Sequence, residues 1–299
     1  MSETSQSLPA SVQPRLQVSN IFWITVVHLL AAYTVFWHFS WTGVALAFAL
    51  HFSLATIGVT LTYHRLLTHR GFKVPRWLEY ALATIGTLSA QGPLMIWVAE
   101  HRLHHRYSDT EKDPHDVRRG FFYAHMGHLF YHKDFEDDRT QWLKYVPDMA
   151  QHRYYHFLND YSVLVALLTL PVLYWAGGWE FVLWGGFVRA VIMLHATWFV
   201  NSACHMWGYK NYPSRDLATN CWWAAILAAG EGWHNNHHSQ PAVAAHGHKW
   251  WEFDLTWIMI RLLERLGLAW DIKRPAAWLA GAASSVAAVP VTGEENLGY

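Results

Sequence analysis

The sequence predicts an all-α integral membrane protein, in which four transmembrane helices form two hairpins beneath a cytoplasmic helical cap that holds a histidine-rich site. Of its 299 residues, 53% are hydrophobic and only 15% are charged. Soluble domains carry about 25% charged residues, so the low charge indicates a surface that faces lipid. The 21 histidines gather near the ends of apolar runs, which predicts a metal site there.

Apolar runs long enough to cross a bilayer set the predicted organisation. A membrane helix needs about 20 consecutive apolar residues, and runs almost free of charge lie at about 21–39, 41–64, 161–179 and 181–200. We therefore expect an N-terminal tail at 1–19, a membrane domain at 20–275 with its cap at 65–160 and 201–275, and a flexible tail at 276–299. Arg189 falls inside the last span, where an ionised side chain should face protein or a cavity.

The distribution of positive charge predicts which side of the membrane each segment occupies. Arg15 precedes the first span, 13 Lys and Arg lie between Arg65 and Arg153, and 7 lie between Lys210 and Arg274. The short links near Ser40 and near Gly177 have neither residue type. By the positive-inside rule, both termini and the cap are expected in the cytoplasm.

Two further apolar runs are expected not to cross. The run Tyr80–Ala99 contains Gly86, Gly92 and Pro93, and a crossing there would separate His101 from the earlier histidines, so a re-entrant or in-plane segment is predicted. The run Leu217–Gly230 has only 14 residues, which suits a buried or interfacial helix.

Nine histidines recur in four groups, all on the predicted cytoplasmic side. On a helix, residues i, i+3 and i+4 lie near one another, so each HxxHH group presents three imidazoles along one face. Two such faces can enclose a pair of metal ions. His64 and His69 are about 140° apart on an ideal helix, so one of them is expected beyond the helix end. The nine candidates are His64, His69, His101, His104, His105, His205, His234, His237 and His238, and Asn201 is a candidate to hold a water.

The remaining histidines have a simpler interpretation. A lone histidine on an apolar helix usually packs or forms a hydrogen bond, and His28, His38, His51 and His195 are interpreted in this way. Surface positions or positions behind the ligands are expected for His115, His125, His128, His132, His152, His156, His246 and His248.

The residue types exclude several kinds of site, but they do not identify the metal. Imidazole suits iron, copper, zinc and nickel alike. The zinc-protease motif HExxH is absent, and only Glu231 to His234 matches the Glu-x-x-His motif that soluble di-iron bundles use twice. Cys204 and Cys221 form no CxxC pair, and a net charge of zero gives no basic field for nucleic acid.

The ordered set HxxxxH, HxxHH, HxxHH resembles the integral-membrane fatty-acid desaturases. The longer words make the resemblance close to the acyl-CoA Δ9 (stearoyl-CoA type) branch, in a bacterial-like form, over residues 20–270. These words are HRLLTHRGF (64–72), EHRLHHRYSDTEKDPHDVRRGFF (100–122), ATWFVNSACH (196–205) and GEGWHNNHH (230–238).

The resemblance implies a di-iron centre in a bacterial inner membrane, with O2 as co-substrate and the active site in the cytoplasm. The nine histidines above would be the iron ligands, and Asn201 would bind one iron through water. Such enzymes remove hydrogens from C9 and then C10 of a saturated C16 or C18 acyl chain and leave a cis double bond. With no haem-binding HPGG and no CxxC in the chain, a separate ferredoxin, rubredoxin or cytochrome would supply electrons.

Substrate contacts are expected in three places. Gln91 and Trp198 are candidates to line an acyl tunnel, and Phe52 is a candidate for its floor, where bulk would favour shorter chains. Cationic side chains that could meet a phosphate-bearing headgroup are Arg118, Arg119 and Lys133. Gln91-Gly92-Pro93 looks more like bacterial and acyl-lipid members, so CoA, acyl carrier protein and glycerolipid all remain open as carrier.

Two alternatives remain. One is a lipid or alkane hydroxylase of the same histidine-box superfamily. The other is a non-catalytic haem- or metal-binding membrane protein, which would need only two to four of these histidines.

Overall fold

The computed structural model describes residues 15–276 and 278, and helices dominate this part of the chain. The described residues contain no β-sheet, and their strand-like pairings are isolated bridges such as Leu16 with Tyr131. Three helices are long and apolar enough to cross a membrane: Val18–Trp37, Trp41–Thr68 and Ser162–His205. These helices confirm the prediction of an all-helical membrane protein.

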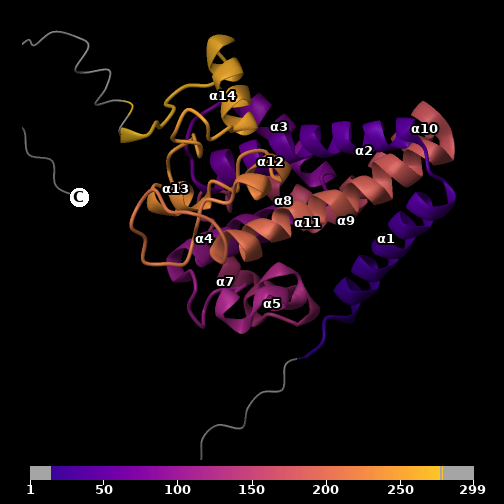
Figure 1. Ribbon diagram of the computed structural model, residues 1–299, viewed down its shortest axis with the longest axis horizontal. Helices are drawn as coiled ribbons and strands as arrows, with labels where there is room; N and C mark the ends of the chain where they lie inside the picture. The colour runs from indigo at the N-terminus through magenta and orange to yellow at the C-terminus, as the bar shows by residue number, and fades with distance from the viewer. Residues whose placement is uncertain (1–14, 277, 279–299) are drawn as a thin grey trace, which may run out of the picture.

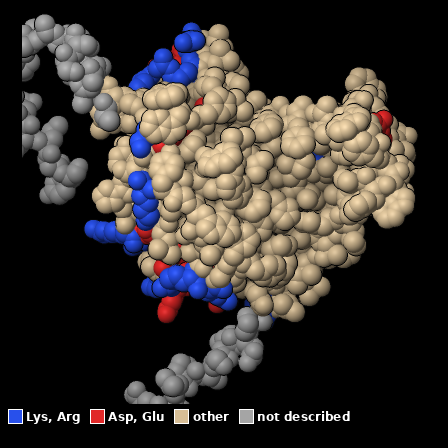
Figure 2. Space-filling view, in the orientation of Figure 1, with Lys and Arg blue, Asp and Glu red and all other residues tan. Residues whose placement is uncertain are grey.

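The apolar helices extend to one side of the molecule, and the shorter helices gather at the other end (Figure 1). The apolar group is α1 (Val18–Trp37), α2 (Trp41–Leu54), its π-helical continuation η1 (Ala55–Thr68), α9 (Ser162–Leu167), α10 (Thr169–Phe181), η4 (Val182–Val188) and α11 (Arg189–Ser202). Most Lys, Arg, Asp and Glu lie at the other end (Figure 2). The charge pattern of the sequence therefore corresponds to a spatial division of the molecule.

The cap consists of short helices joined by turns. They are α3 (Arg76–Leu88), α4 (Leu94–Tyr107), η2 (Val117–Arg119), α5 (Phe121–His125), η3 (Gly127–Phe130), α6 (Asp134–Asp137), α7 (Arg139–Leu143), α8 (Arg153–Asp160), η5 (Ala203–His205), α12 (Trp222–Leu227), α13 (His234–Ser239) and α14 (Leu255–Arg265). A core that includes Leu61, Tyr63, Leu94, Met95 and Tyr155 joins η1 to α3, α4 and α8.

The helical run from 162 to 205 reverses direction at Gly177 and Gly178. Gly178 has φ +64° and ψ −155°, in a region that non-glycine residues avoid. Beyond it, a Cβ at Gly185 would lie 3.0 Å from a methyl carbon of Leu173, so the two arms pack antiparallel. The turn falls where the sequence predicts the link between the third and fourth spans.

Aromatic side chains surround this turn and the turn between α1 and α2. The Ser40 hydroxyl begins α2 by accepting a hydrogen bond from Gly43 N–H, and it donates to Glu180 Oε1 at 2.5 Å, which joins the two turns. Large aromatic residues are often enriched at membrane interfaces. The exposed ones here are Trp37, Phe39, Trp41, Tyr174, Trp175 and Trp179.

Other predicted segments differ in length or position. Tyr80–Ala99 is divided between α3 and α4, neither long enough to be a candidate span, with a break at Ala90 and Gly92, both at positive φ. The predicted helix at Leu217–Gly230 is shorter than expected: only Trp222–Leu227 is helical, because Asn220 pairs in bridges with Tyr209 and Trp233.

The structure also places Arg189 and the C-terminal end of the membrane domain. Arg189 is 3% exposed and donates hydrogen bonds to the carbonyls of Ser89 and Gly185, so it faces protein as expected. Trp278 donates from its indole nitrogen to the His248 carbonyl, so packed structure extends past the predicted tail boundary at 276. The expectations for 1–14 and 279–299 lie outside the described residues.

Candidate metal centre and active site

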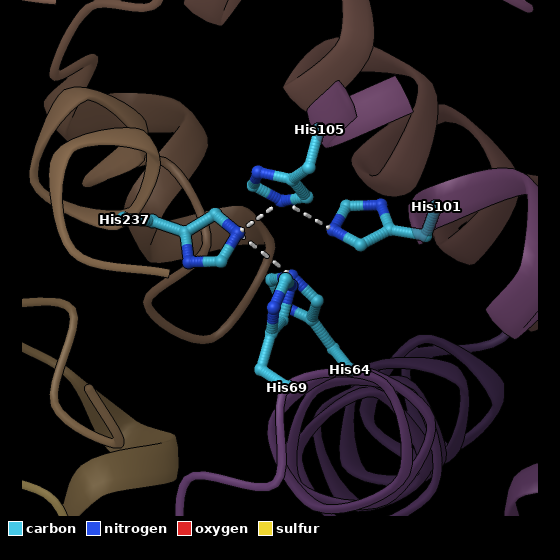
Figure 3. Close-up of side chains that lie close together, drawn as sticks. All are labelled: His64, His69, His101, His105 and His237. Atoms are coloured by element: carbon cyan, nitrogen blue, oxygen red, sulfur yellow. Dashed lines mark hydrogen bonds between the residues drawn. The ribbon is translucent and has the colours of Figure 1, made fainter. Parts of the chain in front are cut away.

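Five histidines from three elements form the first group: His64, His69, His101, His105 and His237 (Figure 3). One ring nitrogen from each lies within 4.8 Å of the others. The Nε2 atom of His237 lies 3.0 Å from that of His64 and 2.8 Å from that of His105. The rings point toward a common centre between η1, α4 and α13.

The π-helical winding of η1 explains how its two histidines meet. The His69 N–H donates to the His64 carbonyl at 3.1 Å, which is the five-residue spacing of a π-helix. Their ring centroids are 4.8 Å apart. His69 lies one residue past the end of η1, as the sequence predicts. The spacing of apolar residues does not predict the π-helix itself.

Four histidines form the second group: His104, His205, His234 and His238. His104 Nε2 lies 3.3 Å from His238 Nε2, and His234 Nε2 lies 3.1 Å from His205 Nε2. The two groups adjoin, because the rings of His105 and His238 have centroids 4.5 Å apart. All nine histidines named from the sequence therefore belong to one of the two groups.

Each HxxHH motif supplies both groups at once. On α4, His101 and His105 point into the first group and His104 into the second, while α13 sends His237 to the first and the other two to the second. Residues i and i+4 are offset from i+3 around a helix. One helix face can therefore bridge two neighbouring centres.

Four carboxylates orient ligands from behind. Each lies near an Nδ1 atom: Glu231 at 2.5 Å from His64, Asp113 at 3.0 Å from His104, Asp109 at 3.1 Å from His205 and Asp216 at 2.8 Å from His238. A carboxylate accepts the Nδ1 proton, which fixes the tautomer and leaves Nε2 free to bind a metal. This role was not predicted from the sequence, although Asp109 and Asp113 follow the first HxxHH within ten residues.

Burial keeps the cluster neutral and therefore able to bind metal. It lowers the pKa values of His101, His105 and His237 well below the ordinary value, and neighbouring imidazoles lower them further. His69 Nε2 is buried without a hydrogen-bond partner. Nine imidazoles in two adjoining groups fit two transition-metal ions, because imidazole binds iron, copper, zinc and nickel.

A mainly apolar cavity begins at the metal centre. It is lined by Ala55, Val59, Met193, Ala196 and Val200 together with His51, His64, His101, His234 and Asn201. A second cavity shares Trp97, His101, Thr197 and Asn201 with the first and adds Gln91 and Trp198. The two cavities thus meet beside the histidines.

A family comparison decides the class of this centre. Residues 37–274 match the model of the family described as fatty acid desaturase. The chain belongs to the fatty acid desaturase family. The family and the fatty-acid desaturase activity expected from the histidine words are thereby confirmed.

Several characterised relatives of this desaturase cover most of its length. It is 43% identical over 89% of its chain to an sn-1 stearoyl-lipid 9-desaturase of Anabaena variabilis, covering 97% of that protein. It is 45% identical over 86% of its chain to an sn-2 palmitoyl-lipid 9-desaturase of Nostoc sp. (90% of that protein). An acyl-CoA C20 Delta5-desaturase of Anemone leveillei is 42% identical over 87% of this chain and 82% of its own.

The predicted headgroup contacts of the desaturase are engaged with other side chains. Arg118 pairs with Asp116 at 2.8 Å, and Lys133 contacts Glu100 at 2.7 Å and Glu136 at 2.6 Å. Arg119 lies over the Tyr123 ring at 3.5 Å. Carboxylates therefore pair with Arg118 and Lys133, whereas Arg119 has no ion pair among the described residues and lines a cavity with Lys112, Lys133 and Lys144.

Phe52 lies differently from the expectation, whereas His246 lies behind the candidate ligands, one of the two positions expected for it. Phe52 lines neither cavity at the centre; its neighbour His51, which donates from Nε2 to the Leu227 carbonyl, lines the apolar one. His246 is buried behind the first group, with its Nδ1 atom 3.1 Å from Glu231 and its ring stacked on His237. Its position on the loop after α13 gave no periodic signal.

Proposed function

We propose that this desaturase inserts a cis double bond between C9 and C10 of a saturated C16 or C18 acyl chain, in unsaturated fatty acid biosynthesis. The observation that carries the proposal is the pair of adjoining histidine groups on the wall of an apolar cavity. The C9 position is supported by relatives whose names specify 9-desaturation at 43% and 45% identity.

Two iron ions would be held by the nine histidines, with Asn201 holding a water on one of them. When bound, they supply the redox chemistry by which O2 and two electrons oxidise an unactivated C–H bond. Overall, the acyl CH2–CH2 unit, O2, two electrons and two protons give a CH=CH unit and two waters. A separate ferredoxin, rubredoxin or cytochrome supplies the electrons.

The residues of the chain hold the reactants and exclude water. Glu231, Asp113, Asp109 and Asp216 accept Nδ1 protons and keep four imidazoles in one orientation. The apolar wall of Ala55, Val59 and Met193 holds the distal part of the acyl chain, while Gln91 and Trp198 line the approach. A dry cavity also prevents side reactions of oxidising chemistry with water.

A membrane glycerolipid is the proposed acyl carrier. Relatives named as lipid-linked desaturases support it. The alternative carriers are CoA and acyl carrier protein.

The chain is proposed to cross a bacterial inner membrane four times, with both termini and the cap in the cytoplasm. The reversal at Gly177 and Gly178 divides the 44-residue helical run into two arms, which supports two hairpins. The 13 Lys and Arg between Arg65 and Arg153 support the orientation.

Product analysis tests the proposed reaction. Membranes containing the protein, with a ferredoxin and its reductase, are given deuterated stearate on phosphatidylglycerol, on CoA or on acyl carrier protein, and the fatty acids are analysed by gas chromatography–mass spectrometry. The expected product is a labelled Δ9 monoene from the glycerolipid, absent with His104→Ala. A labelled hydroxy acid would indicate a hydroxylase, and bound metal without any product would indicate a binding protein.

A further inference from the structure

Three histidines outside the metal centre form a hydrogen-bonded chain across three helices. His28 on α1 contacts His195 on α11, Nε2 to Nε2, at 3.0 Å, and His195 Nδ1 contacts His125 Nε2 on α5 at 2.9 Å. The chain ends at Ser202 Oγ, 3.0 Å from His125 Nδ1, and at the Ile24 carbonyl, 2.7 Å from His28 Nδ1. We call His28, His195 and His125 the histidine clamp.

The end groups fix where the protons lie. A carbonyl only accepts, so His28 Nδ1 donates to the Ile24 carbonyl. At the other end, Ser202 Oγ donates its one proton to the Trp198 carbonyl at 2.9 Å, so it accepts from His125 Nδ1. Both outer ring nitrogens therefore donate, and the chain is tied to the backbone at Ile24 and at Trp198.

This arrangement favours a structural role over metal binding or proton transfer. His195 meets its two neighbours with opposite ring nitrogens, so the three rings have no common point where a metal could bind. The chain also ends on the Ile24 carbonyl, which has no proton to give. The arrangement therefore fixes side chains in place.

Trp198 is the side chain that the clamp surrounds. Its ring centroid lies 5.1 Å from that of His195, 5.7 Å from that of His125 and 6.3 Å from that of His28, with the His28 ring nearly parallel. Trp198 is 4% exposed, and it lines the cavity that also reaches Gln91, His101 and Asn201. It therefore connects the clamp with the approach to the metal centre.

We propose that the histidine clamp positions the Trp198 ring and thereby sets how far the acyl chain advances past the histidines, and so which carbons are desaturated. The clamp residues are positioning residues, and this role rests on the proposed desaturase function. If the Trp198 ring could shift, the acyl chain could stop one carbon before or after its usual position beside the histidines.

A pair of substitutions at one position separates hydrogen bonding from shape. His195→Phe keeps a flat ring but leaves His28 Nε2 and His125 Nε2 without partners, whereas His195→Gln offers one donor and one acceptor. We expect His195→Phe to raise the fraction of monoenes shifted by one carbon about 30-fold, the population change that two lost hydrogen bonds of about 1 kcal/mol each produce. His195→Gln should stay near the wild-type distribution, with iron content unchanged in both.

Further variants guard against a folding defect. His28→Phe removes the bonds to the Ile24 carbonyl and to His195 but leaves His195 bonded to His125, so it should shift the products in the same direction by less. His38→Phe is the matched control on the same helix, because His38 bonds to Tyr33 in an exposed position away from the cavity. Wild-type isomers from His195→Phe, equal changes in the Phe and Gln variants, or a loss of iron that accounts for the change would each overturn the proposal.

A readout that needs no turnover distinguishes failure of the clamp from failure of the proposed function. Fluorine NMR of 5-fluorotryptophan-labelled protein, with the Trp198 signal assigned by Trp198→Phe, should show that signal broadened in His195→Phe and sharp in His195→Gln. An unchanged Trp198 signal in His195→Phe would refute the clamp even if no monoene formed in any sample.

Discussion

Asp113 holds His104 at one edge of the metal centre, because both carboxylate oxygens lie 3.0 Å from His104 Nδ1. It also accepts hydrogen bonds from the backbone N–H groups of Asp109 and His115. Burial raises the pKa of Asp113, but the imidazoles of His115 and His104 outweigh it and hold that pKa below its ordinary value. Asp113 is therefore an anion behind the second group.

Replacing this anion should weaken metal binding. We expect Asp113→Asn to lower iron affinity or activity by about 10- to 100-fold, as for other residues that orient metal-bound histidines. Iron titration of the purified protein measures the change in affinity. Asp116→Asn is the control, because Asp116 pairs with Arg118 and contacts no histidine of the two groups; equal losses from both variants would contradict the orienting role.

The closed part of the apolar cavity gives a second prediction. Ala55 lies nine residues before His64 on one continuous helix and lines the cavity with His51 and Met193. Ala55→Leu should shorten the space for the acyl chain and raise the ratio of C16 to C18 products about tenfold, the discrimination that a change of about one methylene produces.

Phe52→Ala is the matched control for chain length, because Phe52 lines neither cavity at the centre. Gas chromatography of the products from mixed palmitate and stearate checks both variants. A ratio that responds to Phe52→Ala and not to Ala55→Leu would mean that the acyl chain lies elsewhere.

At the residue scale, the grouping of the nine histidines could be predicted and the carboxylates behind them could not. The nine histidines follow short spacings on helices, so periodicity alone brings them to one side. Asp216 reaches His238 from 22 positions away along an irregular loop, and no local sequence pattern predicts that contact.

Among the elements, α4 is held against the end of η1 by one arginine. Arg102 donates to the carbonyls of Leu67 and Thr68 and makes two bonds to the Asp148 carboxylate, at 2.7 and 3.0 Å. These bonds set the position of the first HxxHH relative to His64. Burial raises the pKa of Asp148, but Arg102 and Arg70 outweigh it and hold the pKa below its ordinary value.

That lowered pKa gives a pH-dependent stability with a defined sign. The unfolded Asp pKa is about 3.9, so the pair stabilises the fold above about pH 4 and its contribution is lost as the pH falls through the lower folded value. Asp148→Asn should cost about 2 kcal/mol at pH 7 and less at about pH 2, because protonation of Asp148 removes its charge as the pH falls.

Thermal unfolding in detergent at the two pH values measures this difference. Asp134→Asn is the control, because Asp134 is exposed and has no ion pair among the described residues. An equal drop in melting temperature at both pH values would show that Asp148 acts by packing rather than by charge.

The elements show where sequence periodicity fails. Length and hydropathy predict α1 and the helix formed by α2 and η1, yet the π-helical winding of η1 depends on tertiary packing. An example is the contact of its Tyr63 with Gly86 on α3, where even a Cβ would overlap the ring. The same limit applies to Leu217–Gly230, where bridges to Asn220 replace the expected helix.

At the scale of the whole molecule, charge and chemistry lie at the same end. Lys, Arg, Asp and Glu gather over the cap, and the two histidine groups lie where the apolar helices enter it (Figures 1 and 2). This placement supports the proposal that a lipid acyl chain reaches the centre from the membrane. Composition and charge counts predicted this division without any knowledge of the contacts.

Counting iron tests most directly whether the two histidine groups form the proposed centre. The protein is purified in detergent after expression with iron, and the metal per chain is measured by plasma mass spectrometry for wild type, His104→Ala and the outlying control His156→Ala. We predict two irons per chain in wild type and in His156→Ala, and at most one in His104→Ala, which loses a ligand of the second group. One iron or none in wild type, or an unchanged count in His104→Ala, would contradict a two-iron centre built from these nine histidines.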